Sequence, residues 1–208
     1  MLLLYHKLLC HKLFFPYALP LAQPGSADIH LCILNNYDYN LLNIIGQVRS
    51  SESLVLCDSP LVQKLRARAA ALLGLAPQHA EPPQLVRYSP GQLYKPHVDW
   101  GHGTDASLFI AGQRVATVLA YLTDIPKGCV GGCTHFPHLT REQPQGLRIV
   151  PVRGAACAWP NVSMHGMPLI ETEHAAEPLI VKPESEQQEH QKVALNLWVR
   201  DRPVPWVT

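Results

Sequence analysis

His97 and Asp99 are the residues of this chain whose types and spacing are best suited to chemistry. They lie two positions apart at the end of Arg87–Asp99 (RYSPGQLYKPHVD), and alternate side chains of a β-strand project from the same face. A neutral imidazole and a carboxylate on one face are two of the three ligands of the facial triad that binds non-haem Fe(II). A second histidine from farther along the chain would complete the triad and leave coordination positions open.

A strand that follows this pair offers two hydroxyl groups on one face. Arg114–Leu122 (RVATVLAYL) is apolar and rich in β-branched residues, which predicts a buried strand. Thr117 and Tyr121 have the same parity, so their hydroxyls emerge together. They are either core side chains with satisfied hydroxyls or donors directed at an anionic ligand.

Three further segments predict short strands. Gly131 and Gly132 indicate a tight turn or bulge before a strand at Thr134–Phe136, and Gly154–Asn161 is apolar. Lys192–Arg200 (KVALNLWVR) alternates cleanly between apolar and mixed positions. Its Lys192 shares a face with Ala194, Asn196 and Trp198. A lysine on an inner face is costly unless an anion meets it.

The order of these segments resembles the prolyl 4-hydroxylase family of Fe(II)- and 2-oxoglutarate-dependent dioxygenases. The resemblance runs from about Val48 to Arg202. It is carried by Arg87–Asp99, Arg114–Leu122, Gly131–Pro137, His174–Leu179 and Lys192–Arg200.

The resemblance implies a role for each of eight residues. His97, Asp99 and His174 would be the iron ligands, and Lys192 would bind the distal carboxylate of 2-oxoglutarate. The hydroxyl partners of that carboxylate would be Thr117 with Tyr88 or Tyr121. Tyr94 resembles a tyrosine that lines the iron pocket. Apart from the resemblance, we expect Trp100, Tyr94 and Trp198 to line a groove for an extended proline-rich peptide, since aromatic surfaces suit polyproline II ligands; the alternative for Trp198 is a core position.

The implied reaction is the hydroxylation of peptidyl proline, with release of succinate and CO₂ and with L-ascorbate as the reductant that rescues oxidised iron. The cofactors would therefore be Fe(II), 2-oxoglutarate and ascorbate. Two other functions stay open: the same chemistry on a non-prolyl substrate, and a jelly-roll binding module that has lost catalysis.

Rival residues exist for two of these roles. His165 competes with His174 as the distal ligand, but Ser163–Gly166 has the composition of a loop. Lys182 competes with Lys192, because the interval from His174 to Lys192 is longer than is usual in the family; we expect the polar insert 182–191 to be a lengthened surface hairpin loop.

A zinc site is a further alternative. His135 and His138 lie near Cys129 and Cys133, but the cysteine spacing is not a common one for zinc, and a hairpin would explain the intervening glycines. Cys129 and Cys133 could instead form a disulfide in an oxidising compartment.

These elements predict a mainly β fold with a flanking helix, a double-stranded β-helix of the jelly-roll type, because short strands alternate with Gly and Pro turns. The helix is expected over Ser59–Leu73, capped by Asp58 or Ser59, opened by Pro60 and ended by Gly74. We expect Leu61, Leu65, Ala69 and Leu72 to form its buried stripe and Lys64, Arg66 and Arg68 its solvated face.

At 208 residues and 47% hydrophobic, the chain suits one domain, which we place at residues 46–205. Residues 1–45 are expected to be divergent or poorly ordered, apart from a possible strand at Asp28–Leu34. The net charge of +1 and the absence of a basic stripe indicate no nucleic-acid partner.

The sequence does not support a membrane anchor, and a signal peptide ending near Ala18–Ala22 would be irregular. The family resemblance implies the endoplasmic reticulum. No pattern specifies an oligomeric state.

Overall fold

The computed structural model describes residues 48–103, 105–140, 144–185 and 190–205. The strands are β1 (Glu52–Val55), β2 (Gln84–Tyr88), β3 (Tyr94–His97), β4 (Arg114–Tyr121), β5 (Cys129–Gly131), β6 (Thr134–Phe136), β7 (Leu147–Ile149), β8 (Ala156–Pro160), β9 (His174–Ala176), β10 (Leu179–Val181) and β11 (Lys192–Arg200). The helices are α2 (Pro60–Ala71) and α3 (Ala106–Ala111), and the 3-10 turns are η1 (Pro77–His79), η2 (Ile170–Thr172) and η3 (Pro183–Ser185). The described part of the chain is therefore mainly β with few helices.

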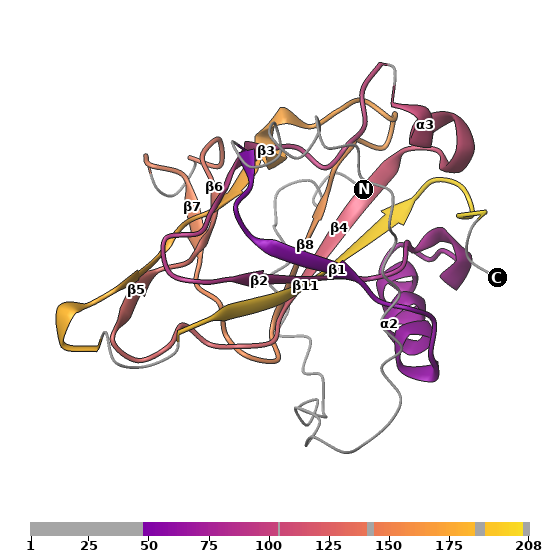
Figure 1. Ribbon diagram of the computed structural model, residues 1–208. Helices are drawn as coiled ribbons and strands as arrows, with labels where there is room; N and C mark the ends of the chain where they lie inside the picture. The colour runs from indigo at the N-terminus through magenta and orange to yellow at the C-terminus, as the bar shows by residue number, and fades with distance from the viewer. Residues whose placement is uncertain (1–47, 104, 141–143, 186–189, 206–208) are drawn as a thin grey trace.

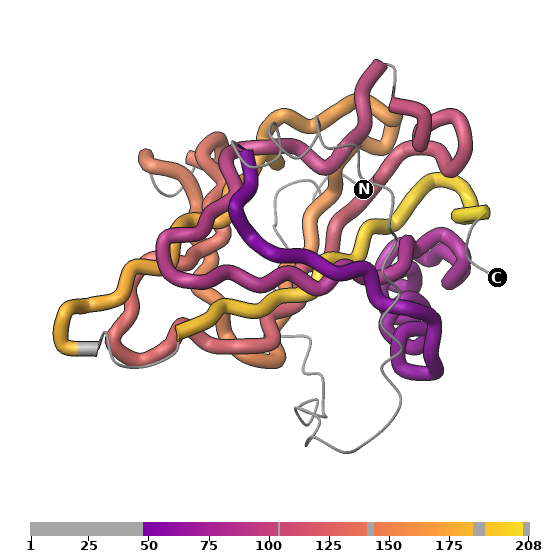
Figure 2. Tube along the Cα trace, viewed as in Figure 1, coloured from indigo at the N-terminus to yellow at the C-terminus, as the bar shows by residue number. Residues whose placement is uncertain are grey.

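The larger sheet has five antiparallel strands in the order β1-β2-β11-β4-β8. Its central strands β4 and β11 are the two most clearly predicted segments, and Figure 2 shows β11 running beside β2, far from it in sequence. The register places Lys192 opposite Tyr88, Ala194 opposite Tyr121 and Trp198 opposite Thr117. Because directly opposed residues share a face, all these side chains emerge on one side of the sheet.

The second sheet has four strands in the order β3-β9-β6-β7, and β10 and β5 form a separate pair. Buried aromatic residues fill the space between the two larger sheets. Tyr88, Tyr121 and Trp159 come from the five-stranded sheet and pack in one cluster with Phe136 of β6. The two sheets thus cover each other, and the residues just described lie between them.

Helix α2 packs on the other face of the five-stranded sheet, against Leu195, Leu197 and Val199 of β11. Figure 1 shows it on the far side of that sheet from β3, β6 and β7. Ser59 caps the helix as expected, accepting a hydrogen bond from the Val62 amide at 3.2 Å.

The predicted buried stripe of α2 is wrong at two positions, and one predicted solvated residue is buried. Leu61 and Leu72 are 46% and 47% exposed, whereas Val62 and Arg66 are buried beside Leu65 and Ala69. Arg66 lies inside because its guanidinium donates to the carbonyls of Ala80 and Pro77, which follow the helix and cover it.

The hairpins expected around Gly131 and in the 182–191 insert are not formed. Strand β5 pairs with β10, whereas β6 pairs with β7 and β9, so the glycines mark a change of sheet. Both glycines have positive φ, and a Cβ at Gly131 would come within 2.4 Å of the Pro178 carbonyl oxygen. The insert joins β10 to β11, which belong to different sheets; its residues 186–189 lie outside the described residues.

The predictions for residues 1–45, including the strand at Asp28–Leu34, lie outside the described residues. Among the described residues, no helix has the length and apolar character needed to cross a membrane. Cys129 and Cys133, for which a disulfide was an alternative, are free thiols.

Candidate metal centre and ligand pocket

His97, Asp99 and His174 form a three-residue cluster between the two sheets. One potential ligand atom from each lies within 4.8 Å of the other two. His97 ends β3 and His174 begins β9, and the two are direct partners in the antiparallel register. Asp99 lies just past the end of β3 rather than on the strand, with Oδ1 3.9 Å from His97 Nε2 and Oδ2 3.6 Å from His174 Nε2.

Hydrogen bonds fix which nitrogen each imidazole presents to this cluster. His97 Nδ1 lies 2.8 Å from the Lys95 carbonyl oxygen, and His174 Nδ1 lies 3.0 Å from that of Thr172. A carbonyl can only accept, so each Nδ1 carries the proton and each Nε2 presents a lone pair. Thr117 orients the third group by donating from Oγ1 to Asp99 Oδ2 at 2.7 Å. Such support is typical of protein metal ligands.

The electrostatics of the cluster keep His97 and Asp99 in the state that binds a metal. Burial, with a further contribution from His174, lowers the pKa of His97 to about 4, so its imidazole is neutral at physiological pH. Burial alone would raise the pKa of Asp99, but His174, His97 and the Thr117 hydroxyl outweigh it and hold that pKa below its usual value. Two imidazoles and one carboxylate are the donor set that suits non-haem Fe(II).

Aromatic rings hold the two histidines in place. The Tyr94 ring stacks on His97 with centroids 3.6 Å apart, and Trp159 meets His174 edge-on at 4.7 Å. Tyr94, predicted to line the pocket, is thus in direct contact with the cluster.

Lys192 is a buried cation in the same space between the sheets. It is 2% exposed, and its Nζ donates to the Gly132 carbonyl at 2.7 Å and lies 4.9 Å from the Tyr88 ring centroid. No ion pair joins it to a carboxylate within the described ranges. Burial lowers the pKa of Lys192 to about 8, as expected for an ammonium group with few compensating partners.

Two tyrosines and a threonine surround this lysine's end of the space. Tyr121, Tyr88 and Thr134 are buried, and Tyr121 Oη lies 2.8 Å from Thr134 Oγ1. Burial raises the pKa of Tyr88, so its phenol is neutral. Thr134 is a hydroxyl that the sequence reasoning missed, although its place two residues after the Gly131–Gly132 turn was a signal for it.

Thr117 lies at the metal end of the space rather than beside Lys192. It is opposite Trp198 in the register, and a strand rises about 3.3 Å per residue, so it is roughly 20 Å along the sheet from the Lys192 backbone. Its hydroxyl bonds to Asp99 and lies 3.0 Å from Asn161 Nδ2. The expectation that Thr117 partners the same carboxylate as Lys192 is therefore corrected: its contacts support Asp99.

Trp198 faces the same space but contacts a network that the sequence did not reveal. The Arg114 guanidinium lies 3.9 Å from the Trp198 ring centroid and forms two hydrogen bonds to Glu81. Arg200 binds the same carboxylate at 2.7 Å. A cavity of about 160 Å³ lies between this network and Asp99. These three charged residues come from distant segments, so no local spacing pointed to them.

His165 and Lys182, the alternatives to His174 and Lys192, are not part of the cluster. His165 is exposed in a loop and Lys182 is exposed before η3. In the described part of the chain, His97, Asp99 and His174 are the residues identified as a possible metal-binding group, and Cys129, Cys133, His135 and His138 form no such group. His135 and His138 instead lie beside carboxylates, at 3.7 Å from Glu177 and 2.9 Å from Glu173.

Comparison with known proteins agrees with this geometry. The sequence profile of the 2OG-Fe(II) oxygenase superfamily matches residues 83–200. Prolyl 4-hydroxylase subunit alpha-1 of Gallus gallus is 32% identical over 148 residues, which are 70% of this chain and 25% of that protein. Probable prolyl 4-hydroxylase 6 of Arabidopsis thaliana is 30% identical over 149 residues, 65% of this chain and 50% of that protein.

Among solved structures, the 2-oxoglutarate complex of the viral collagen prolyl hydroxylase from Paramecium Bursaria Chlorella virus-1 is similar, with a TM-score of 0.56 and 25% identity. The alignment covers 77% of this chain and 87% of the viral one. The chain spans only about a quarter of the chicken subunit and half of the Arabidopsis protein. The profile match covers more than half of the chain and contains all three members of the metal cluster. The chain therefore belongs to the 2OG-Fe(II) oxygenase superfamily.

Proposed function

We propose that this chain is an Fe(II)- and 2-oxoglutarate-dependent dioxygenase that hydroxylates peptidyl proline. The observation that carries the proposal is one space between two sheets with a His-Asp-His donor set at one end and a buried, uncompensated lysine at the other. That arrangement suits a ligand with a metal-chelating end and a distant carboxylate. The similarity to prolyl 4-hydroxylases supports proline as the substrate.

His97, Asp99 and His174 would hold the iron, and Lys192 would bind the distal carboxylate of 2-oxoglutarate with Tyr88, Tyr121 and Thr134 around it. An ammonium and hydroxyl donors give charge-assisted hydrogen bonds to such a carboxylate. The bound iron and 2-oxoglutarate supply the oxidising chemistry, with release of succinate and CO₂, and ascorbate would keep the iron reduced. The protein excludes water from the reacting groups and orients them.

Several finer assignments belong to the same proposal. The two facing sheets would form a jelly roll, and residues 46–205 would be the catalytic domain. Tyr94, which stacks on His97, and Trp198, which lies on the site face of β11, would line the substrate groove. The family resemblance supports a proline-containing peptide or protein as the partner and the endoplasmic reticulum as the compartment.

The experiment incubates the purified chain with Fe(II), 2-oxoglutarate, ascorbate, air and a panel of proline-rich peptides. Mass spectrometry reads peptide oxidation while succinate is measured in parallel. We expect one added oxygen on proline with matching succinate. His97→Ala and Asp99→Ala should abolish both products, whereas His165→Ala, a matched exposed histidine, should retain them. Succinate without oxidised peptide would reject proline as the substrate. The absence of both products, from protein that is folded and iron-loaded, would reject the proposed dioxygenase activity.

A further inference from the structure

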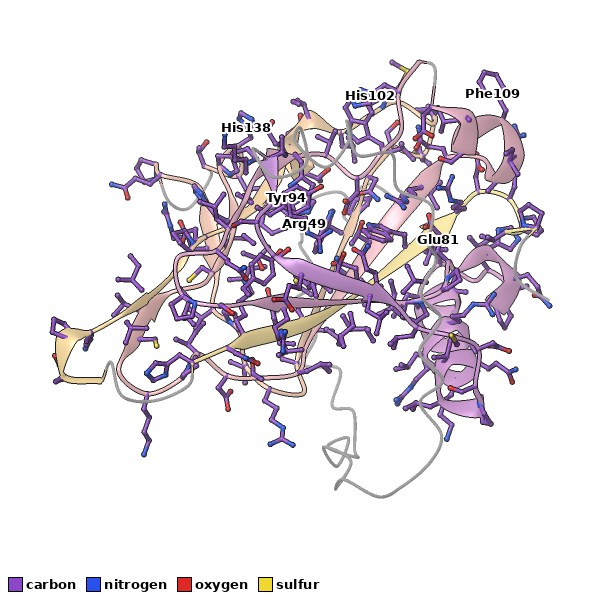
Figure 3. The ribbon with its side chains drawn as sticks, in the orientation of Figure 1. Arg49, Glu81, Tyr94, His102, Phe109 and His138 are labelled. Atoms are coloured by element: carbon purple, nitrogen blue, oxygen red, sulfur yellow. The ribbon has the colours of Figure 1, made fainter. Side chains whose placement is uncertain are left out.

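Asn161 is a completely buried polar residue close to the metal cluster, and none of the assigned roles uses it. It directly follows β8, and Asn161 Nδ2 lies 3.0 Å from Thr117 Oγ1. Thr117 Oγ1 in turn lies 2.7 Å from Asp99 Oδ2, so one hydroxyl separates Asn161 from the carboxylate of the cluster. Tyr94, which stacks on His97, is labelled in Figure 3 and marks this part of the molecule.

The Thr117 hydroxyl has one proton and two neighbours that could accept it. Asn161 Oδ1 lies 3.4 Å from Thr117 Oγ1, farther than Asp99 Oδ2 at 2.7 Å. An ionised carboxylate can only accept, and it is a stronger acceptor than an amide oxygen. The hydroxyl therefore donates to Asp99. Its oxygen remains free to accept, and the Asn161 amide nitrogen, which can only donate, meets it there.

The main chain of Asn161 fixes the position from which this amide donates. Its backbone N–H donates to the Val115 carbonyl at 2.9 Å, and its carbonyl accepts from the Leu169 amide at 3.0 Å. Leu169 precedes η2, and the last residue of that turn, Thr172, provides the carbonyl that orients His174. Asn161 is thus tied to the strand that carries Thr117 and to the segment that leads to His174.

A donor at this position affects how well Thr117 supports Asp99. A hydroxyl that accepts a hydrogen bond becomes polarised and is a better donor, so bonds in such a chain strengthen one another. The Asn161 contact also limits rotation of the hydroxyl, because turning it away from Asp99 would bring two N–H and O–H donors together. Complete burial excludes water as a replacement partner.

We propose that Asn161 is a positioning residue of the metal centre, whose side-chain amide donates to Thr117 Oγ1 and so holds that hydroxyl as a donor to Asp99. The inference rests on the proposed function for the identity of the metal, Fe(II). It makes β8, through the residue that follows it, an element that contributes to metal binding as well as to the core.

The test is a double-mutant cycle on Fe(II) affinity. Asn161→Leu, which is similar in size but has no amide, is made in the parent chain and in Thr117→Val. In the parent chain we expect Fe(II) binding to weaken about three- to tenfold, the equivalent of one neutral hydrogen bond. In Thr117→Val the same substitution should change the affinity by less than about twofold, because the hydroxyl through which Asn161 acts is absent.

Ser163→Ala is the matched control for the loop that follows β8. The Ser163 hydroxyl accepts from the His165 and Met167 amides within that loop, each at 3.2 Å, and its loss should leave Fe(II) affinity unchanged. Asn161→Ser, whose side chain is too short to reach Thr117, replaces Asn161→Leu if the larger residue prevents folding. Anaerobic metal titration gives the affinities, and thermal unfolding of each metal-free chain shows that it is folded.

A spectroscopic arm uses the Co(II)-loaded chains, because ligand-field absorption responds to the orientation of a metal-bound carboxylate. Asn161→Leu and Thr117→Val should shift the bands in the same direction, and the double variant should match Thr117→Val. Equal losses of Fe(II) affinity from Asn161→Leu in both backgrounds, no loss in either, or a similar loss in Ser163→Ala would overturn the role of Asn161. A parent chain that binds no Fe(II) would instead overturn the proposed function, and this inference with it.

Discussion

At the scale of single residues, the centre depends on hydrogen bonds that set the orientation and charge of each group. The carbonyls of Lys95 and Thr172 direct the two histidine Nε2 atoms inward. The Thr117 hydroxyl orients the Asp99 carboxylate, and the Thr117 side chain is completely buried. These supporting contacts determine how strongly three side chains can bind a metal.

Replacing Thr117 by valine tests that support with little change in shape. Asp99 would lose its 2.7 Å hydrogen bond, so we expect Fe(II) affinity to fall about 10- to 100-fold. Thr134→Val is the contrasting variant, because Thr134 bonds to Tyr121 near Lys192 and should change 2-oxoglutarate affinity instead. Metal titration of both variants measures the difference. Unchanged iron affinity in Thr117→Val would show that the Asp99 orientation does not depend on it.

The lowered pKa of Lys192 predicts how cofactor binding depends on pH. An ammonium with a pKa of about 8 loses its charge as the pH rises through that value, and Tyr88, Cys133, Cys157 and Glu177 are the titratable groups around it. Affinity for the 2-oxoglutarate dianion should therefore be constant below about pH 8 and fall above it, by up to about tenfold per pH unit. Calorimetric titration across this range measures the effect. Lys192→Met should bind weakly at every pH, and a pH profile like that of the parent chain would reject Lys192 as the cation.

At the scale of elements, strand pairing brings the groups together. The β3–β9 register sets His97 opposite His174, and the β2–β11–β4 register sets Lys192, Tyr88 and Tyr121 on one face. The turn between β5 and β6 carries the chain from the two-stranded sheet of β5 and β10 into the four-stranded sheet. It also supplies the Gly132 carbonyl that Lys192 contacts.

Gly131→Ala should disrupt this turn. Gly131 has a φ of +76°, and an added Cβ would lie 2.4 Å from the Pro178 carbonyl oxygen. We expect a loss of unfolding free energy of about 2–4 kcal/mol, from backbone strain and the clash together. Gly154→Ala is the matched control, because Gly154 also has positive φ but faces open space, so its cost should be about 1 kcal/mol. Denaturant unfolding compares the two, and equal losses would show that close packing against Pro178 is unimportant.

The strands with strong apolar or alternating patterns could be predicted from the sequence, but their partners could not. β4 and β11 occur where the pattern of Arg114–Leu122 and Lys192–Arg200 placed them. The expected hairpin at Gly131 was wrong because two glycines specify a turn and not which strands it joins. Arg66 was misplaced because its acceptors, the Ala80 and Pro77 carbonyls, lie beyond the helix.

At the scale of the whole molecule, two sheets enclose one elongated site. The metal cluster was predictable because His97 and Asp99 are close in sequence and the family resemblance indicated His174. The Glu81–Arg114–Arg200 network was not, since its members are distant in sequence and meet only when β4 pairs with β11. Thr117 was assigned to the wrong end of the site because parity gives a face but not a position along it.

The central claim is that the His97–Asp99–His174 cluster and Lys192 bind one 2-oxoglutarate molecule between them. The most direct measurement is an anaerobic titration of the Fe(II)-loaded chain with 2-oxoglutarate, followed by the visible charge-transfer absorption of the chelated cofactor. We predict that the absorption develops in the parent chain and in His165→Ala and is absent in His174→Ala. In Lys192→Met it should require a far higher 2-oxoglutarate concentration. The same titration curve in Lys192→Met or His174→Ala as in the parent chain would contradict the account.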